Sequence, residues 1–177
     1  FETITYPMSY EFIRNNHVVE DIVGTLSDNE MWASERCGLH IHVSKTDEVA
    51  KKMPLILAFL ESNKDEIIKF SRRTYDSFHE WCDFYTDEDL LTAYEAERIC
   101  LRPQGRRHMC INLTNEHTIE FRCFAGTLNA KRVYGYIEFI LALIENITEL
   151  FDTSDKPTFK DLEKVSGFNL FKENLVF

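Results

Sequence analysis

Three segments of the chain alternate between apolar and polar side chains, and this pattern limits the possible folds more than any other feature. The segments are residues 37–44, 108–113 and 118–124. Alternation with a period of two is typical of a β-strand with one buried face and one open face. The four residues 114–117 suit a short hairpin loop between the second and third segments. We therefore expect a mostly antiparallel sheet whose two faces differ in chemistry.

The side chains expected on the two faces can be read directly from the alternation. The apolar face would carry Leu39, Ile41, Val43, Met109, Ile111, Leu113, Ile119, Phe121 and Cys123. The opposite face would carry His40, His42, His108, Cys110, Asn112, Thr118, Glu120 and Arg122. If the three strands share one sheet, two imidazoles, a carboxylate, a guanidinium and an amide gather on its open face. That face is the candidate site.

Helical spacing of apolar residues predicts that helices surround these strands. Helices are expected from Ser9 to Gly24, from Thr46 onward, over residues 65–73 and 90–98, and after Asn129 and Thr158. Pro54 would kink the second helix or begin a new one. The strongest helix carries an apolar stripe of Val133, Ile137, Ile140, Leu141, Ile144, Ile147 and Phe151. With helices packed on one face of the sheet, the fold class is α+β.

The remaining segments are expected to be irregular, apart from the first. Residues 1–5 suggest a strand that ends before Pro7. Residues 25–36 and 75–89 are polar or mixed polar and aromatic, which favours loops that could contact a substrate. Because the chain starts inside this expected strand without a Met, we expect residues 1–177 to be a single domain from the C-terminal part of a longer chain.

Composition excludes several classes of protein. A formal net charge of −10 argues against broad binding to nucleic acid or to an anionic membrane. No apolar run reaches the roughly 18 residues that a membrane helix needs. The five cysteines are odd in number and include no CxxC pair, which fits a reducing compartment. We therefore expect a cytoplasmic protein.

The residues expected on the open face suit metal and phosphate chemistry, although each has a plainer interpretation. His40 and His42 could bind a metal or donate to phosphate, but an isolated His-x-His is more often a partly hydrated strand face. Glu120 suits Mg²⁺ and Arg122 suits phosphate. As an exposed ion pair, the same two residues would contribute about 0–1 kcal/mol.

The arginines of the chain offer a second candidate for phosphate binding. The only dense basic run is Arg98, Arg102, Arg106 and Arg107. It could neutralise a polyphosphate, but a solvated loop is the commoner outcome for such a run. Arg73 ends a predicted helix, where its charge complements the helix dipole, and it could also bind a ligand.

In their order along the chain, the motifs resemble the amidoligase family of carboxylate–amine ligases, which is related to glutamine synthetase and glutamate–cysteine ligase. The resemblance is carried by residues 37–43 (CGLHIHV), 112–113 (NL) and 118–128 (TIEFRCFAGTL), and the opening residues 1–8 (FETITYPM) also fit. It extends from Phe1 to about Phe151. The resemblance implies a catalytic domain like that of glutamine synthetase.

The resemblance, together with the open-face candidates, assigns a role to each site residue. The expected metal ligands are His40, Glu120 and Glu2, the catalytic arginines are Arg122 and Arg107, and the nucleotide contacts are His42, Arg73, Arg102, Arg106 and Asn112. The implied cofactors are ATP and Mg²⁺, with Mn²⁺ as a substitute. The implied reaction joins a carboxylate to an amine through an acyl phosphate, on a small-molecule, peptide or protein substrate.

One feature of the related enzymes is missing from this sequence, so two alternatives stay open. The strand with Glu-x-Glu that supplies the main metal carboxylates would precede Phe1. The chain could therefore be a non-catalytic binding module with the same fold. A Zn²⁺ hydrolase built on His40 and His42 would need a third ligand, and the sequence contains no HExxH motif. The substrate and the oligomeric state are not readable from the sequence.

Overall fold

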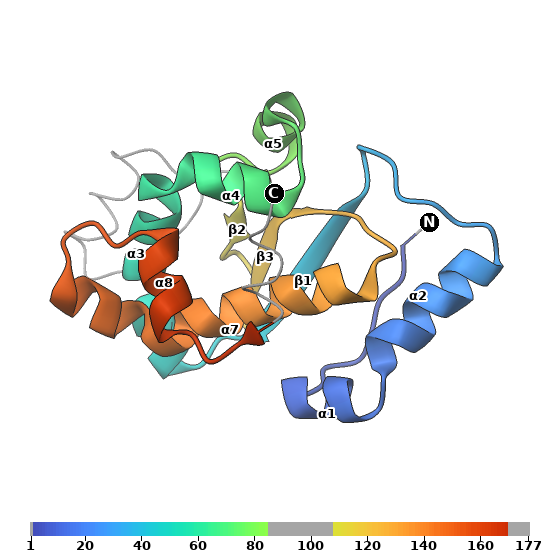
Figure 1. Cartoon of the computed structure of the whole chain (residues 1–177), viewed down its shortest axis with the longest axis horizontal. Helices are drawn as coiled ribbons and strands as arrows, with labels where there is room; N and C mark the ends of the chain where they lie inside the picture. Colours follow the sequence, from blue (N-terminus) through green and yellow to red (C-terminus); the bar gives the residue numbers. More distant parts are fainter. Residues whose placement is uncertain (1, 85–107, 170–177) are drawn as a thin grey trace.

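A three-stranded antiparallel sheet forms the centre of the fold. The computed structural model describes residues 2–84 and 108–169 (Figure 1). Its strands are β1 (Gly38–Ser44), β2 (Ile111–Asn112) and β3 (Thr118–Ala125). The order β1-β3-β2 places β3 in the middle, paired with both neighbours. The predicted hairpin between the second and third strands is confirmed.

Seven helices in the described residues complete the fold. They are α1 (Tyr10–Asn15), α2 (Val18–Asp28), α3 (Asp47–Ser62), α4 (Lys64–Ser71), α5 (Tyr75–Trp81), α7 (Ala130–Thr153) and α8 (Phe159–Val165). None of these helices combines the length and the apolar composition that crossing a membrane requires. The expected helix over residues 90–98 lies outside the described residues.

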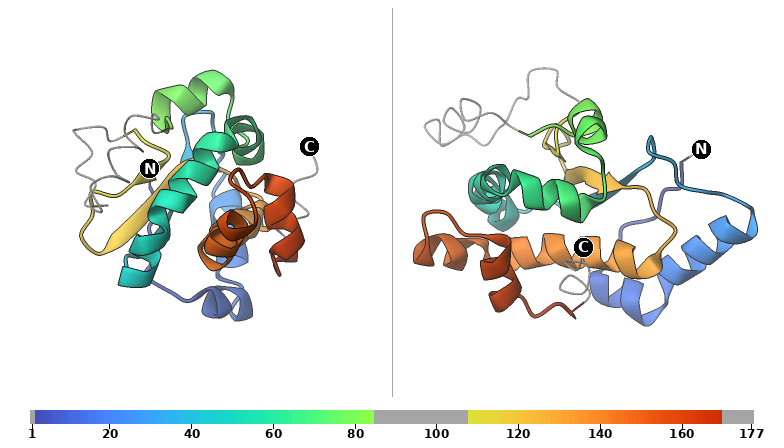
Figure 2. Two further views of the ribbon diagram at one scale, coloured as in Figure 1. Left: turned by 90° about the vertical axis from the view of Figure 1, so that its left-hand side faces the viewer. Right: turned by 45° about the horizontal axis from the view of Figure 1, so that its top comes forward.

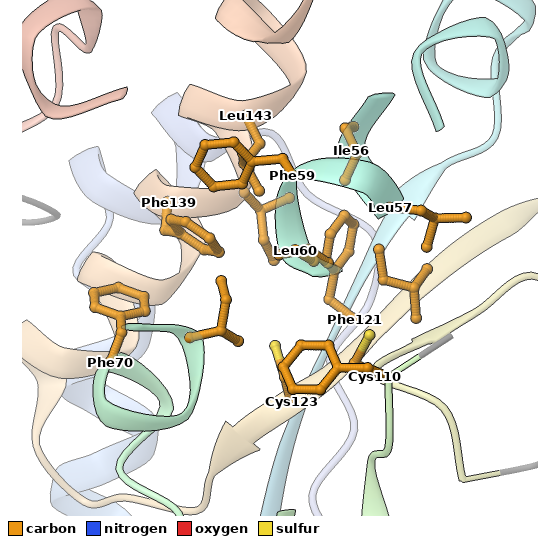
Figure 3. Packing of buried hydrophobic residues seen from close by; sticks show 14 of the residues in the cluster. Ile56, Leu57, Phe59, Leu60, Phe70, Cys110, Phe121, Cys123, Phe139 and Leu143 are labelled. Atoms are coloured by element: carbon orange, nitrogen blue, oxygen red, sulfur yellow. The ribbon is translucent and has the colours of Figure 1, made fainter. Parts of the chain in front are cut away.

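Helices cover one face of the sheet, as the alternation predicts. In the left view of Figure 2, the sheet lies on one side, and α3, α4, α7 and α8 lie together on the other. Ile119, Phe121 and Cys123 of β3 are completely buried in the core. Figure 3 shows Phe121 and Cys123 among core residues of these helices. Leu39, Ile41 and Val43 of β1 pack against the same core. The α+β class and the apolar face are therefore confirmed.

Aromatic rings make up much of this core. The ring of Phe70 on α4 lies 4.9 Å from that of Phe139 on α7 and 5.5 Å from that of Tyr136. Phe139 stacks on Phe159 of α8 at 5.3 Å. The most deeply buried face of α7 therefore differs from the predicted apolar stripe. Tyr136 and Phe139 are buried, whereas five residues of the stripe are only half-buried: Val133, Ile137, Leu141, Ile144 and Phe151.

Side-chain caps begin the helices that were expected at Ser9, Thr46, Asn129 and Thr158. The side chains of Ser9, Thr46, Asn129 and Thr158 each accept a hydrogen bond from a backbone N–H three residues later. In α8 the cap is reciprocal, because the Asp161 carboxylate accepts from the backbone N–H of Thr158. These caps depend on neighbouring residues, which is why the sequence identifies them.

Several predicted boundaries are wrong. Residues 2–9 form no strand, and the helix expected up to Gly24 is broken at His17, whose φ of 53° is left-handed. The second half, α2, continues to Asp28, into the expected loop. The stretch expected to be irregular contains α5. Helix α3 continues through Pro54, so no new helix begins there.

The pairing of β1 with β3 contains a bulge that the sequence did not predict. Ile41 is paired with Phe121 but Leu39 with Phe124, so β3 has one residue more than β1 in this interval. Arg122 and Cys123 therefore both lie opposite His40. An extra residue reverses the alternation beyond it. This is why Phe124 is buried directly after the buried Cys123.

Cys110 corrects the predicted open face. Cys110 as a whole residue is only 1% exposed, and it lies beside Phe121 and Cys123 in the core (Figure 3). The strand is shorter than predicted, because β2 contains only Ile111 and Asn112. At Cys110 the backbone N–H donates to the carbonyl of Asp83, and its own carbonyl accepts from Arg122. The period of two therefore does not extend back to this residue.

Candidate functional site

Each strand contributes a polar side chain to one row across the open face of the sheet. His42 of β1 is paired with Glu120 of β3, and Glu120 is paired with Asn112 of β2. His40 and Arg122 follow at the bulge, where Arg122 and Cys123 lie opposite His40. Five of the predicted site residues therefore come together on one face.

Glu120 lies at the centre of this group. Its Oε1 atom is 3.0 Å from Nδ1 of His40 and 2.9 Å from Nη1 of Arg122. Its Oε2 atom accepts a hydrogen bond from Nδ2 of Asn112 at 2.8 Å. Nε2 of His42 is further away, 3.8 Å from Oε1. The Glu120 side chain is only 10% exposed, so these donors replace the water that a free carboxylate would bind.

Two threonines orient the outer members of the row. The Oδ1 atom of Asn112 accepts from the backbone N–H of Thr114 at 3.0 Å and from its hydroxyl at 2.7 Å. This fixes the amide with its NH₂ group toward Glu120. The hydroxyl of Thr118 lies 3.2 Å from Nδ1 of His42. The sequence analysis missed Thr114, although a hydroxyl two residues after an asparagine is a common turn partner.

Arg122 is bound on one side only. Its Nη1 atom donates to Glu120, but its buried Nε atom has no hydrogen-bond partner among the residues that the structure describes. An unpaired N–H in a buried position costs roughly 1–3 kcal/mol. An acceptor for this donor would have to come from outside the described residues.

The environment of His40 favours a neutral imidazole. Burial lowers the pKa of His40, and the positive charge of Arg122 lowers it further. The Glu120 carboxylate acts in the opposite direction, followed by weaker effects of Arg73 and Glu2. With Nδ1–H donating to the carboxylate, the Nε2 lone pair is left to accept. Histidines that bind metals commonly make this second hydrogen bond to a carboxylate.

The metal ligands are incomplete within the part of the chain that the structure describes. No group of three or more His, Cys, Asp or Glu residues is arranged there to hold a metal ion. His40 and Glu120 form a pair, and Glu2 is exposed but close enough to affect the pKa of His40. The third ligand that a zinc hydrolase would need is not found in those residues.

The predicted arginines separate into two groups. Arg102, Arg106 and Arg107, with the rest of the basic run, lie outside the described residues. Arg73 is buried and donates to the backbone carbonyls of Cys123 and Phe124 and to the hydroxyl of Ser77. The sequence analysis missed this set of contacts, because nothing local marks the bulge to which the two carbonyls belong.

Gly38 is a further residue of the site that the sequence analysis did not single out. A Cβ atom at this position would lie 2.8 Å from Nη2 of Arg73 and 3.2 Å from Nε2 of His40. A larger residue here would force one or both of these side chains to move. The signal was present in the sequence, because Gly38 directly precedes the alternating His-x-His segment.

Comparison with known proteins agrees with the motifs at residues 37–43, 112–113 and 118–128, whereas residues 1–8 lie outside the matched range. The family model described as "putative amidoligase enzyme" matches residues 9–144, which include all three strands of the site. Neither the curated proteins nor the solved structures gave a match to this chain. The family match covers well over half of the 177 residues and includes each strand that contributes to the Glu120 cluster. The chain therefore belongs to the amidoligase family.

Proposed function

We propose that this protein is an ATP- and Mg²⁺-dependent ligase that joins a carboxylate to an amine through an acyl phosphate. Membership of the amidoligase family supports a ligase-type function. The observation that carries the proposal is the shared position of Glu120, His40 and Arg122 on the open face of the sheet. A carboxylate, an imidazole and a guanidinium in contact suit a site for a metal and phosphates.

Arg122 is suited to the phosphoryl group. Its Nη1 atom is held by Glu120, while the unpaired Nε–H can donate to an oxygen of the ligand. A phosphate oxygen there would remove the penalty for the buried donor and would gain a charge-assisted hydrogen bond. Because the guanidinium is already oriented, it can stabilise the charge that develops on the transferred group at little cost in reorganisation.

Glu120 is suited to Mg²⁺, and His40 is proposed as its neighbour at the metal, although the two do not form a closed cage. Mg²⁺ is usually bound by one or two carboxylates together with substrate phosphates and water. A single buried carboxylate beside a phosphate-binding arginine fits this pattern. When bound, Mg²⁺ would neutralise phosphate charge during transfer. Arg107, Arg102, Arg106, Asn112, His42 and Glu2 are proposed to complete the nucleotide and metal contacts.

The proposed reaction has two steps. An oxygen of the substrate carboxylate attacks the γ-phosphorus of ATP, ADP leaves, and an acyl phosphate forms. The amine nitrogen then attacks the acyl carbon, inorganic phosphate leaves, and the nitrogen loses a proton to give the amide. The protein supplies orientation and electrostatic stabilisation rather than a covalent intermediate.

Calorimetric titration with ATP and Mg²⁺ tests the nucleotide site. The protein is expected to bind Mg²⁺·ATP, and Glu120→Gln, which removes the charge but keeps the shape, should weaken binding roughly 10- to 100-fold. Glu116→Gln, the same change at an exposed position of the hairpin loop, should have no effect. Absence of binding by the unaltered protein, or equal binding by Glu120→Gln, would contradict the proposal.

Trapping with hydroxylamine tests the intermediate. Hydroxylamine attacks an acyl phosphate to give a hydroxamate, which a colour reaction detects. Incubation with ATP, Mg²⁺ and a panel of amino acids and short peptides should give a hydroxamate together with an equal amount of ADP. ADP without hydroxamate for every carboxylate in the panel would indicate hydrolysis instead of ligation.

A further inference from the structure

Arg73 is an unusual arginine, because it is buried without an acidic partner. Arg73 is only 9% exposed, and none of the ion pairs in the described part of the chain includes it. A buried charge is costly unless it is compensated. The compensation comes from oxygen atoms that are not ionised, namely two backbone carbonyls of β3 and one hydroxyl of α5.

The guanidinium of Arg73 spans two consecutive carbonyls at the bulge. Nε donates to the carbonyl of Cys123 at 3.2 Å, and Nη2 donates to the carbonyl of Phe124 at 3.1 Å. The third nitrogen, Nη1, donates to the hydroxyl of Ser77 on α5 at 3.2 Å. A bulge disrupts the ladder of hydrogen bonds between strands. Arg73 therefore supplies donors where the ladder with β1 is irregular.

The turn after α4 holds Arg73 in this position. Arg72, which ends the helix, has a left-handed φ of 61°. The backbone N–H of Arg73 donates to the Ser71 hydroxyl at 3.3 Å, and the carbonyl of Ser71 accepts from the Tyr136 hydroxyl at 3.2 Å. The arginine is thus anchored to α4 and α7 at its backbone and to β3 at its side chain.

The same bulge directs Arg122. Side chains alternate between the two faces along a strand. If the bulge in β3 moved by one position, the side chain next to it would turn from the open face to the buried face. Arg122 lies directly before the two carbonyls that Arg73 holds. Its own backbone N–H donates to the carbonyl of Cys110 at 2.8 Å. The location of the bulge therefore decides whether the Arg122 guanidinium reaches Glu120.

We propose that Arg73 is a positioning residue, which fixes the bulge of β3 and thereby directs Arg122 to the phosphoryl group. The inference rests on the proposed function and adds a residue that acts on the reaction without touching the substrate. It differs from the role expected from the sequence, in which Arg73 contacts the nucleotide directly. The two roles predict different behaviour of combined variants.

A double-mutant cycle on nucleotide affinity separates these roles. The probe is ATP with Mg²⁺, titrated into the full chain and into Arg73→Lys, Arg122→Ala and the combined variant. Lysine keeps the charge but cannot donate to two carbonyls through a fork. Arg73→Lys is expected to weaken binding roughly 10-fold. In the Arg122→Ala background it should cause no further loss, because the residue through which it acts is gone.

Hydrogen exchange provides a readout that needs no nucleotide. The amides of Arg122 and Gly126, which donate to Cys110 and Cys37 on either side of the bulge, should exchange about 10-fold faster in Arg73→Lys. The amide of Lys45, which donates to His117 at the other end of the sheet, should be unchanged. Arg14→Lys, the same substitution at an exposed arginine of α1, serves as the control.

Each outcome decides the inference. Losses of affinity that multiply in the combined variant would indicate direct contact and overturn it. Unchanged exchange at Arg122 and Gly126 would overturn it as well. If the unaltered protein binds no Mg²⁺·ATP, the proposed function fails, and the exchange rates alone then show whether Arg73 holds the bulge.

Discussion

The two faces of β3 are stabilised by different kinds of interaction. On the covered face, Ile119 and Phe121 are completely buried in the core that the sheet forms with the helices. On the open face, Glu120 is also nearly buried, but it is stabilised by polar contacts with His40, Arg122 and Asn112. Apolar contacts on one face can therefore carry the stability while the other face keeps polar groups ready for a ligand. The difference separates folding from function within one strand.

The largest expected effect is on the covered face. Phe121→Ala should lower the free energy of unfolding by roughly 3–5 kcal/mol, because it removes a fully buried ring and leaves a cavity. His42→Ala, on the next strand but on the open face, removes a half-exposed ring and should cost less than about 1 kcal/mol. Urea denaturation measures both. Similar losses for the two variants would remove the distinction between the faces.

The regular parts of both faces could be predicted from the sequence. The alternation of residues 118–122 places Glu120 and Arg122 on the side opposite Ile119 and Phe121, as the structure confirms. The caps at Ser9 and Thr46 were likewise predictable, because a cap involves only residues close in sequence. Patterns with a period of two or of 3.6 residues are local properties, so one sequence is enough to find them.

The irregular parts depend on contacts between distant residues. The bulge in β3 is supported by Arg73, 50 residues away from Cys123 in the sequence, and no local pattern links them. The burial of Cys110 depends on Asp83 and Arg122, which bond its backbone. The break at His17 separates α1 from α2 in a segment whose apolar spacing suggests one helix. The geometry around Arg122 could therefore not be predicted from spacing alone.

A smaller loss of stability is expected from a substitution at Gly38, next to the bulge. Gly38→Ala would place a methyl group 2.8 Å from Nη2 of Arg73 and 3.2 Å from Nε2 of His40. Overpacking of this kind typically costs about 1–3 kcal/mol, and displacement of Arg73 should also weaken the binding of Mg²⁺·ATP. Thermal unfolding and calorimetric titration measure the two effects.

Gly24 offers a matched control for this substitution. It lies inside α2, and a Cβ atom there would meet nothing within 4 Å. Gly24→Ala should therefore increase stability by about 0.5–1 kcal/mol, because alanine favours the helix. If Gly38→Ala were as harmless as Gly24→Ala, the close packing of Arg73 against the site would be refuted.

The smallest expected effect is a difference in reactivity between cysteines inside the core and outside it. Hydrogen bonds from the hydroxyl and the backbone N–H of Ser34 lower the pKa of the half-buried Cys37 thiol. Burial raises the pKa of Cys82 to about 11 and also raises that of Cys110. At pH 7, iodoacetamide should therefore modify Cys37 before these two residues, as peptide mass spectrometry would show.

The pH dependence of this reaction follows from the thiolate, which is the nucleophile. The rate at Cys37 should rise with pH and level off at a lower pH than for a free cysteine, because its hydrogen bonds stabilise the ionised form. Ser34→Ala removes the hydroxyl and should move this midpoint to higher pH, with little change in unfolding temperature, since Ser34 is exposed. A midpoint unchanged by Ser34→Ala would mean that the hydroxyl does not stabilise the thiolate. Equal rates at Cys37 and Cys110 would mean that the core opens to the reagent as readily as the loop before β1.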